Sequence, residues 1–239
     1  VCAAATGRAA MGLYGKMAGV ALTDYIHSKL IVVWGANPAA SGIHLIPVLQ
    51  EAQRRGAKLV VIDPLKSGTA KRADLHLQPR PGTDIAVAQS IHRFLFEEGH
   101  ADLEFLAAHA TGAAEFRRRA SEWTFERAAE VSGVPAASLR AFAEMYAVAN
   151  PAVVRCGWGL ERNRNGGSAV ASVIALPAVA GKFGVLGGGY TMSNSAAWKF
   201  GKVGGSTEDA PSGRRLNMNR LGEALTADSN IDVLFVYNS

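Results

Sequence analysis

The chain lacks the sequence signatures of several common protein classes. It contains no G-x-G-x-x-G motif, so the ordinary glycine fingerprint of NAD-binding proteins is absent. Its two cysteines, Cys2 and Cys156, are far apart and form no C-x-x-C pair. Neither an iron–sulfur cluster nor a structural zinc site can therefore be held wholly by these residues, and they provide no disulfide framework.

Long apolar runs and basic stripes with interleaved aromatics are also missing. No apolar run approaches the ~18 to 20 residues that a membrane-spanning helix needs, so we expect no direct membrane span. The net charge is +5, but the basic residues are dispersed and aromatics make up only 8%. This composition argues against nucleic-acid binding and favours a small ligand that carries phosphate.

The ends of the chain indicate a piece of a longer protein. The 239 residues begin at Val1 without a methionine and stop just after the strand-like run 233–237. We therefore expect flanking domains, and any targeting signal would lie outside this piece, which leaves the compartment unassigned.

The segment from Leu30 to Asp63 carries the strongest pattern in the sequence. Residues 31–34 form an apolar run typical of a strand, 35–38 can turn sharply, and 41–55 have apolar residues at helical spacing. Gly56 would end this helix, and residues 58–62 predict a second strand that delivers Asp63 to its tip. Such a strand–loop–helix–strand unit with a terminal acid is typical of nucleotide binding in open parallel sheets.

The same alternation continues along the chain. We expect a strand at 75–77, a rigid turn at 79–84, a helix at 85–98 capped by Thr83 or Asp84, and a helical region from 102 to 149. A strand at 152–156, a glycine-rich loop at 157–167, a helix at 168–180, irregular loops at 181–189 and 191–215, and a strand at 231–237 follow. The predicted fold is α/β, a doubly wound Rossmann-like αβα nucleotide-binding domain over 1–190 and the start of a second α/β domain over 191–239.

Several short motifs occur together and in a fixed order, and their combination is far more specific than any one of them. With them the chain resembles the central part of the molybdenum or tungsten oxidoreductases of the dimethyl sulfoxide reductase superfamily, which includes formate dehydrogenases and periplasmic nitrate reductases. The motifs are Gly35-Ala36-Asn37-Pro38, Ile62-Asp63-Pro64, Pro81-Gly82-Thr83-Asp84, Gly157-Trp158-Gly159 with Glu161-Arg162 and Gly166-Gly167, and Leu176-Pro177 followed by Gly181-Lys182-Phe183-Gly184.

The resemblance implies cofactors and partners. The metal would be molybdenum or tungsten, held by bis-molybdopterin guanine dinucleotide between two domains, and a [4Fe–4S] cluster would lie in a preceding N-terminal part. The reaction would be a two-electron redox change of a small-molecule substrate, with electrons leaving singly to a partner subunit or domain. The piece by itself would not be catalytic.

The resemblance also gives a role to Cys2. In the cysteine- or selenocysteine-ligated members, the metal ligand precedes the Asn of the G-x-N-P loop by about 35 residues, as Cys2 precedes Asn37 here. A helix that ends in an aromatic-Gly pair follows the ligand, and Tyr14-Gly15 matches it. A soft thiolate suits molybdenum or tungsten, so Cys2 is predicted as the catalytic metal ligand. Without the resemblance, a lone cysteine among small residues would be a buried apolar side chain.

The first group of predicted cofactor-binding residues lies at strand ends. Loop residues Gly35, Ala36 and Asn37 would offer backbone N–H groups and an amide to the pyrophosphate or pterin edge. Asp63 would bind ribose hydroxyls, and Asp84 resembles the family carboxylate that accepts N–H groups from the guanine edge. Pro64 and Gly82, in the same two motifs, are also predicted to bind the cofactor. The alternatives are turn capping by Asp63 and N-capping of the next helix by Asp84, and both are compatible with binding.

Basic and hydroxyl residues after Asp63 form a second candidate group. Lys66, Ser67 and Thr69 are predicted to contact phosphate, with a solvated basic loop as the alternative. Family members often have Arg directly after Asp-Pro, whereas this chain has Leu65, so Lys66 is the nearest substitute.

The glycine-rich loop supplies the last candidate group. Its glycines would permit close approach of the backbone, and the charged pair Glu161-Arg162 would fix orientation; the alternative is a glycine-rich turn with a surface ion pair. Trp158 would pack over the pterin or brace the loop, and His44, which follows the first loop, is more simply structural. The binding residues predicted here are Gly157, Trp158, Gly159, Glu161, Arg162 and Asn165.

Two departures bear on the substrate. Formate dehydrogenases have His directly after the metal ligand and Arg beyond the glycine-rich helix exit, where this chain has Ala3 and Ser193-Asn194. We therefore prefer an oxidoreductase of unassigned substrate over a formate dehydrogenase. Two other classes remain as alternatives: a non-catalytic relative such as the large iron–sulfur subunit of complex I, and an unrelated NAD(P)-dependent dehydrogenase.

Overall fold

The structure of the protein is a computed structural model. The structure describes residues 3–17, 19–193, 216–217, 220–227 and 231–236. The chain divides into two compact units, one within residues 2–198 and one that contains 199–239. The domain boundary expected at residue 190 stays a prediction.

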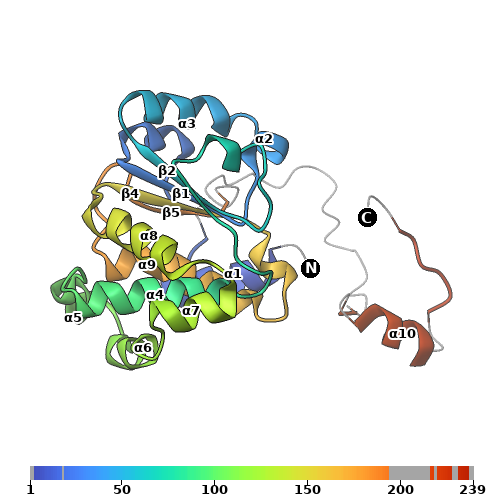
Figure 1. Ribbon diagram of the computed structural model, residues 1–239. Helices are drawn as coiled ribbons and strands as arrows, with labels where there is room; N and C mark the ends of the chain where they lie inside the picture. Colours follow the sequence, from blue (N-terminus) through green and yellow to red (C-terminus); the bar gives the residue numbers. More distant parts are fainter. Residues whose placement is uncertain (1–2, 18, 194–215, 218–219, 228–230, 237–239) are drawn as a thin grey trace. The chain divides into compact units, whose positions relative to one another are not determined.

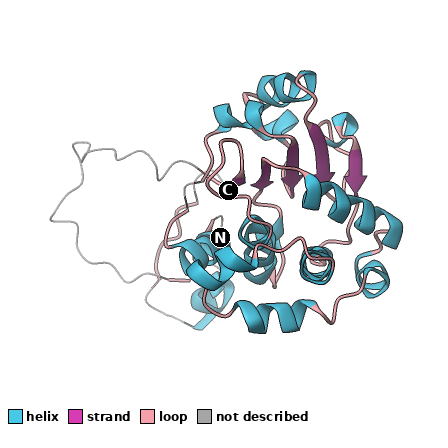
Figure 2. Cartoon of the chain, turned by 90° about the vertical axis from the view of Figure 1, so that its left-hand side faces the viewer, coloured by secondary structure: helices cyan, strands magenta, loops and turns pink. Residues whose placement is uncertain are grey.

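A five-stranded parallel sheet with strand order β3-β2-β1-β4-β5 is the centre of the first unit. β1 (Leu30–Trp34) is the middle strand; Leu30 lies opposite Lys58 of β2 (Lys58–Ile62) on one side and opposite Ala152 of β4 (Ala152–Cys156) on the other. The strands lie side by side with helices on both sides of the sheet (Figure 2). The α/β, doubly wound fold class predicted from the sequence is confirmed.

Alternate residues of the buried strands serve two separate cores. From β1, Ile31 and Val33 face the side covered by α3 (Leu45–Arg54), where they pack with Leu45 and Leu49. The opposite residues of the strand pack in the larger core against α4 (Asp84–Glu97), α8 (Ala136–Val148) and α9 (Gly166–Val179). Figure 1 shows α3 above the sheet and the other three helices below it. Apolar residues on both faces of a strand are typical of a parallel sheet that is covered twice.

The order of the strands places a switch point between β1 and β4. The chain leaves β1 toward β2 and β3 on one side, then returns through the helical region to β4 and β5 on the other side. Ligands of open α/β sheets bind beyond the carboxyl ends of the strands at such a point. The loops that begin at Gly35 and Gly157 therefore start at the expected position.

Three predictions about the fold are wrong in detail. The helix expected over 41–55 begins later, as α3 (Leu45–Arg54), because a separate short helix, α2 (Pro38–Ser41), ends at Gly42. The buried face of α3 is Leu45, Leu49 and Ala52, while Ile43 is exposed. The strand β5 (Gly189–Thr191) was not expected in the glycine-rich region; it forms because β4 offers a free edge for pairing. Residues 231–236 form no strand, since within the part of the chain described here no neighbouring strand pairs with them.

The helical region from 102 to 149 consists of four separate helices, and Leu139 and Phe142 are buried as predicted. In the described residues no helix is long and apolar enough to cross a membrane. The remaining elements are α1 (Ala4–Tyr14), η1 (Leu22–His27), η2 (Ala70–Arg72), β3 (Leu75–Leu77), α5 (Leu103–His109), α6 (Ala113–Ala120), α7 (Phe125–Ser132), η3 (Leu160–Arg162) and α10 (Leu221–Ala227).

Helix α4 packs in the larger core, where its Leu95 is fully buried. We expect Leu95→Ala to lower the free energy of unfolding by about 2 to 5 kcal/mol, because it removes buried methyl groups and leaves a cavity. The exposed Leu65 provides the matched control, for which the same substitution should change the free energy by less than about 0.5 kcal/mol. Urea unfolding of the full chain measures both values, and equal effects would contradict the assigned core.

Candidate functional site

Two loops cross closely at the carboxyl ends of β1 and β4. The Gly157 N–H donates to Trp34 O over 2.7 Å, and the Gly159 N–H donates to Gly35 O over 3.0 Å. A Cβ on Gly157 would lie only 2.2 Å from Gly35 O, so this position requires glycine. The Gly35 N–H donates to Ile62 O and is not available to a ligand. These glycines therefore bring the two loops against each other. The sequence predicts the close approach of the backbone but not that the other loop is its partner.

A cavity of about 200 Å³ opens beside this crossing. It is smaller than the ~300 to 1,000 Å³ of a pocket for a complete drug-sized ligand, so it fits one end of a larger molecule. The cavity brings together six residues predicted to bind a cofactor, from four separate motifs: Gly35, Asp63, Pro64, Asp84, Gly159 and Arg162. Its other lining residues are Ile62, Pro79, Arg80, Pro81, Leu160 and Asn163.

Asp84 is the most constrained of these residues. It is only 8% exposed, and its Oδ1 accepts the indole N–H of Trp34 at 2.7 Å. Burial raises the pKa of Asp84, and the bond from Trp34 partly offsets this rise. Thr83, not Asp84, occupies the N-cap position of α4, and its hydroxyl donates to Arg80 O. The interpretation of Asp84 as the helix cap is therefore wrong, and a buried carboxylate faces the cavity instead.

Asp63 closes a turn and lines the cavity. Its Oδ1 accepts the Leu65 N–H at 2.8 Å, which closes the turn after β2. The residue is only partly buried and lines the cavity, and its contact with a ribose stays a prediction. Turn capping and ligand binding are compatible at this position.

Asn37 and Thr69 form a separate pair next to the cavity. The Thr69 hydroxyl donates to Asn37 Oδ1 at 2.8 Å and accepts the Ala39 N–H at 3.0 Å. Thr69 is fully buried, so its hydroxyl orients the Asn37 amide and the start of α2. Ser67 Oγ accepts the Ala70 N–H, whereas Lys66 is exposed. Direct phosphate contact by this group stays a prediction.

The predicted pair Glu161-Arg162 does not act as a surface ion pair. Glu161 is buried, and its carboxylate accepts the N–H groups of Ala3 and Thr6 and the Thr6 hydroxyl. Burial would raise the pKa of Glu161, but these hydrogen bonds outweigh it and the pKa lies below its usual value. Arg162 is exposed and lines the cavity.

Other predicted residues have supporting positions. Asn165 Nδ2 donates to Gly82 O at 2.8 Å, which ties the glycine-rich loop to the turn before α4. Trp158 and Ala36 are partly buried outside the cavity lining, and His44 is exposed at the start of α3. None of these positions tests a contact with a cofactor.

Cys2 and Asn194 lie outside the described residues. The helix expected after Cys2 is present as α1, and Gly15 follows Tyr14 with a φ of 67° as the aromatic-Gly ending requires. Within the described part of the chain, no three His, Cys, Asp or Glu side chains gather where they could hold a metal ion.

Two residues of the site were not predicted. Trp34 is fully buried in β1, and its hydrogen bond to Asp84 depends on tertiary contact between β1 and α4. Arg80 lines the cavity while its guanidinium donates to the carbonyls of Glu130 and Val131. The sequence signal for Arg80 was its place between two prolines, directly before the Gly82-Thr83-Asp84 turn.

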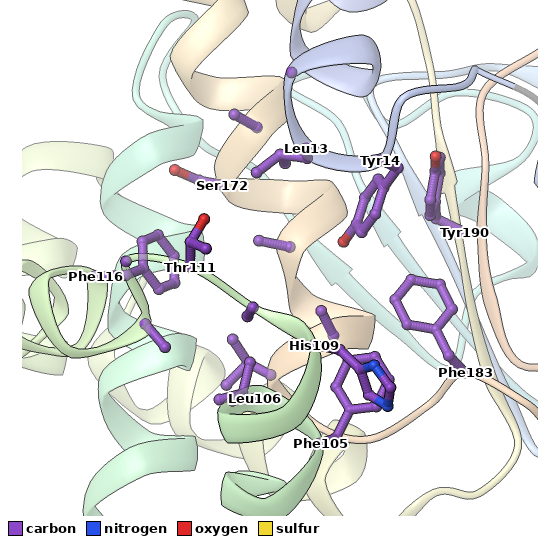
Figure 3. Close-up of a pocket in the computed structure, with 18 of the residues that line it drawn as sticks. Leu13, Tyr14, Phe105, Leu106, His109, Thr111, Phe116, Ser172, Phe183 and Tyr190 are labelled. Carbon is purple, nitrogen blue, oxygen red and sulfur yellow. The ribbon is translucent and has the colours of Figure 1, made fainter.

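A second, larger cavity of about 820 Å³ lies elsewhere in the first unit (Figure 3). Aromatic rings from several elements face it, including Tyr14 from α1, Phe105 from α5, and Phe183 and Tyr190 near β5. None of the residues predicted to bind the cofactor lines this cavity. It is therefore separate from the site at the carboxyl ends of the strands.

Comparison with known proteins identifies the family of the chain. Residues 2–239 match the family model described as molybdopterin oxidoreductase. The chain belongs to this family, within the dimethyl sulfoxide reductase superfamily. A pterin cofactor with molybdenum or tungsten follows from membership.

Individual relatives cover much of this chain but little of their own length. A probable oxidoreductase, YoaE, of Bacillus subtilis is 34% identical over 94% of this chain and 34% of its own. Formate dehydrogenase H of Escherichia coli is 31% identical over 74% of this chain and 26% of its own length. The structure of acetylene hydratase from Pelobacter acetylenicus matches with a TM-score of 0.66 and 27% identity, over 76% of this chain and 24% of that one. The chain thus spans about a third or less of these relatives.

The buried carboxyl of Asp84 has a consequence for stability. Asp84→Asn keeps an oxygen for the Trp34 N–H but removes the charge that burial disfavours. Because the folded-state pKa is raised, the wild-type carboxyl stabilises the fold below its unfolded pKa and loses that contribution as pH rises through the folded pKa. We expect the variant to be at least as stable as the wild type at pH 7, with the difference shrinking toward about pH 4. Urea unfolding over this pH range measures it.

Asp74 gives the control with the opposite sign. Hydrogen bonds from the Leu59 N–H and Lys58 outweigh the effect of burial and lower the pKa of Asp74. Its contribution to stability is therefore present above the unfolded pKa and lost as pH falls, so Asp74→Asn should be less stable than the wild type at pH 7. A loss of stability at pH 7 in Asp84→Asn as well would show that Asp84 is a structural acid.

Proposed function

We propose that the chain is part of the catalytic subunit of a molybdenum- or tungsten-dependent oxidoreductase that binds bis-molybdopterin guanine dinucleotide. The observation that carries the proposal is the buried Asp84 carboxylate, which faces a cavity at the switch point of the sheet in a member of the molybdopterin oxidoreductase family. A buried acid without a basic partner is costly, and such groups mark binding sites.

The chemistry of Asp84 suits a guanine edge. Guanine presents adjacent N–H donors, which a carboxylate can accept together, and each such charge-assisted bond contributes about 1.5 to 3 kcal/mol. The Trp34 indole fixes the carboxylate through one oxygen and leaves further lone pairs for the ligand. Asp63 at the rim would then accept ribose hydroxyls, and Arg162 would lie near phosphate.

Cys2 would supply the protein ligand to the metal. When bound, the cofactor would supply a metal with accessible +4 and +6 states and thus the capacity for two-electron chemistry. This chain would hold one dinucleotide arm and deliver the thiolate. A second domain would hold the other arm, and a [4Fe–4S] cluster in a preceding part would pass single electrons to a partner subunit or domain.

Two substitutions separate the roles of these residues in the full-length protein. Cys2→Ala should retain the pterin dinucleotide but lose the protein-sulfur contribution to the X-ray absorption spectrum of the metal, together with activity. Asp84→Asn should instead lower the dinucleotide content, because an amide cannot accept two guanine N–H groups. An unchanged metal–sulfur contribution in Cys2→Ala, or a full complement of dinucleotide in Asp84→Asn, would contradict the corresponding assignment.

The substrate is proposed to be a small molecule other than formate. Formate dehydrogenase H is a relative, but Ala3, the residue after the proposed ligand, carries only a methyl group and cannot relay a proton. General acid–base assistance typically contributes about 10² to 10⁴ in rate. Asn194 would also replace a guanidinium by an amide, which loses the charge that pairs with a carboxylate.

We therefore expect the complete holoenzyme to oxidise formate at least about 100-fold more slowly than formate dehydrogenases do. A steady-state assay with formate and a viologen acceptor measures this rate, and turnover at ordinary formate dehydrogenase rates would contradict the expectation.

A non-catalytic role, as in the large iron–sulfur subunit of complex I, is the second candidate. Retention of Cys2 and of each cofactor loop favours the metal enzyme, and metal analysis of the full-length protein distinguishes the two. Membership of the molybdopterin oxidoreductase family removes the unrelated NAD(P)-dependent dehydrogenase.

A further inference from the structure

The carboxylate of Glu161 joins two segments that are 158 residues apart in the chain. Its Oε1 accepts the Ala3 N–H at 2.5 Å, and its Oε2 accepts the Thr6 N–H at 3.2 Å and the Thr6 hydroxyl at 2.7 Å. Glu161 is 7% exposed and Thr6 is fully buried. All three donors belong to the first residues of α1, and both carboxylate oxygens are used.

The start of α1 depends on this carboxylate because it has no local substitute. Ala3 occupies the N-cap position and has no side-chain acceptor, and the first turn contains no acidic residue. Helices leave their first N–H groups unsatisfied and favour negative charge there. Ala3 also has a φ of 69°. Among the described residues, no other non-glycine residue has a positive φ, and a side chain makes this conformation unfavourable. Glu161 holds the N–H group of that residue.

The position of Glu161 is itself fixed by the site. The residue lies in η3, directly after the loop that crosses Gly35, and a Cβ on Gly166 would lie 2.4 Å from its Cα. The other end of α1 is held on α9, where the Tyr14 hydroxyl donates to Ile174 O at 2.8 Å. The site loop and α9 therefore determine where the first residues of α1 lie.

We propose that Glu161 is the positioning residue for the metal-binding thiolate. The proposal rests on the proposed function, in which Cys2 is that ligand. One peptide bond joins Cys2 to Ala3, and the N–H of this bond is the group that Glu161 holds. The carboxylate thereby holds the residue that directly follows Cys2 in the sequence, and it does so from the loop that also borders the Asp84 cavity. Residues that orient a metal ligand typically change affinity or activity about 10- to 100-fold when removed.

The test uses Glu161→Gln in the full-length protein, since glutamine has one acceptor oxygen where glutamate has two. The first measurement is the protein-sulfur contribution to the X-ray absorption spectrum of the metal in the holoenzyme. The second is the rate at which iodoacetamide alkylates Cys2 in the metal-free protein, followed by mass spectrometry of the Cys2 peptide. We expect a weaker sulfur contribution and a change in alkylation rate of about tenfold, at unchanged dinucleotide content.

Three further variants separate positioning from folding. Thr6→Val removes only the hydroxyl bond to Glu161 at nearly constant volume and should shift both measurements in the same direction, whereas Thr6→Ser keeps the hydroxyl and should match the wild type. Glu51→Gln, at a surface carboxylate paired with Arg54 and Arg55 on α3, should leave both unchanged. If Glu161→Gln does not fold, the two Thr6 variants decide the matter.

Wild-type values of both measurements in Glu161→Gln and Thr6→Val would overturn the proposal and leave Glu161 as a cap of α1. A failure of the proposed function has a different signature, which is an unchanged metal–sulfur contribution in Cys2→Ala. In that event the alkylation rate of Cys2 by itself decides whether Glu161 fixes this residue.

Discussion

The close crossing of the loops after β1 and β4 is the constraint on which the rest of the site depends. Backbone hydrogen bonds from Gly157 and Gly159 join the two loops, and there is no room for a side chain at Gly157. The crossing places Gly159 and Arg162 beside Asp63, which follows β2, and Asp84, the first residue of α4. It also delivers Glu161, which belongs to the same loop, to the start of α1. One tertiary contact therefore organises both the cavity and the segment that follows Cys2.

The two buried carboxylates of the site are held in different ways. Glu161 has three protein donors, so its hydrogen-bonding capacity is used inside the chain and its pKa is lowered. Asp84 has the Trp34 indole as its side-chain donor, and burial raises its pKa. A carboxylate that is satisfied internally stabilises the fold, whereas one that is buried and only partly satisfied gains most from a ligand with N–H groups. This contrast supports a structural part for Glu161 and a binding part for Asp84.

The family relationship describes the whole chain, whereas the geometry of the site describes individual residues. The comparisons assign the chain to the molybdopterin oxidoreductases as a whole, with relatives that bear the names of several different reactions. Function lies in the site and not in the fold, so the substrate must be argued from the residues near the metal. In this chain Glu161 accepts the N–H group of Ala3, and the side chain of Ala3 is only a methyl group. A site with a histidine at this position would have an imidazole there instead.

The sequence by itself determined the alternation of strands and helices, the doubly wound class and the motif order, because hydrophobic periodicity and turn residues are local signals. It located Asp63, Asp84 and the glycine loops at strand ends for the same reason. Only the tertiary structure decided that Trp34 donates to Asp84, that Thr69 orients Asn37, and that Glu161 caps α1 and does not pair with Arg162. Each of these contacts joins residues at least 32 positions apart. A local pattern cannot specify such partners, since their proximity arises only when the sheet and its covering helices have packed.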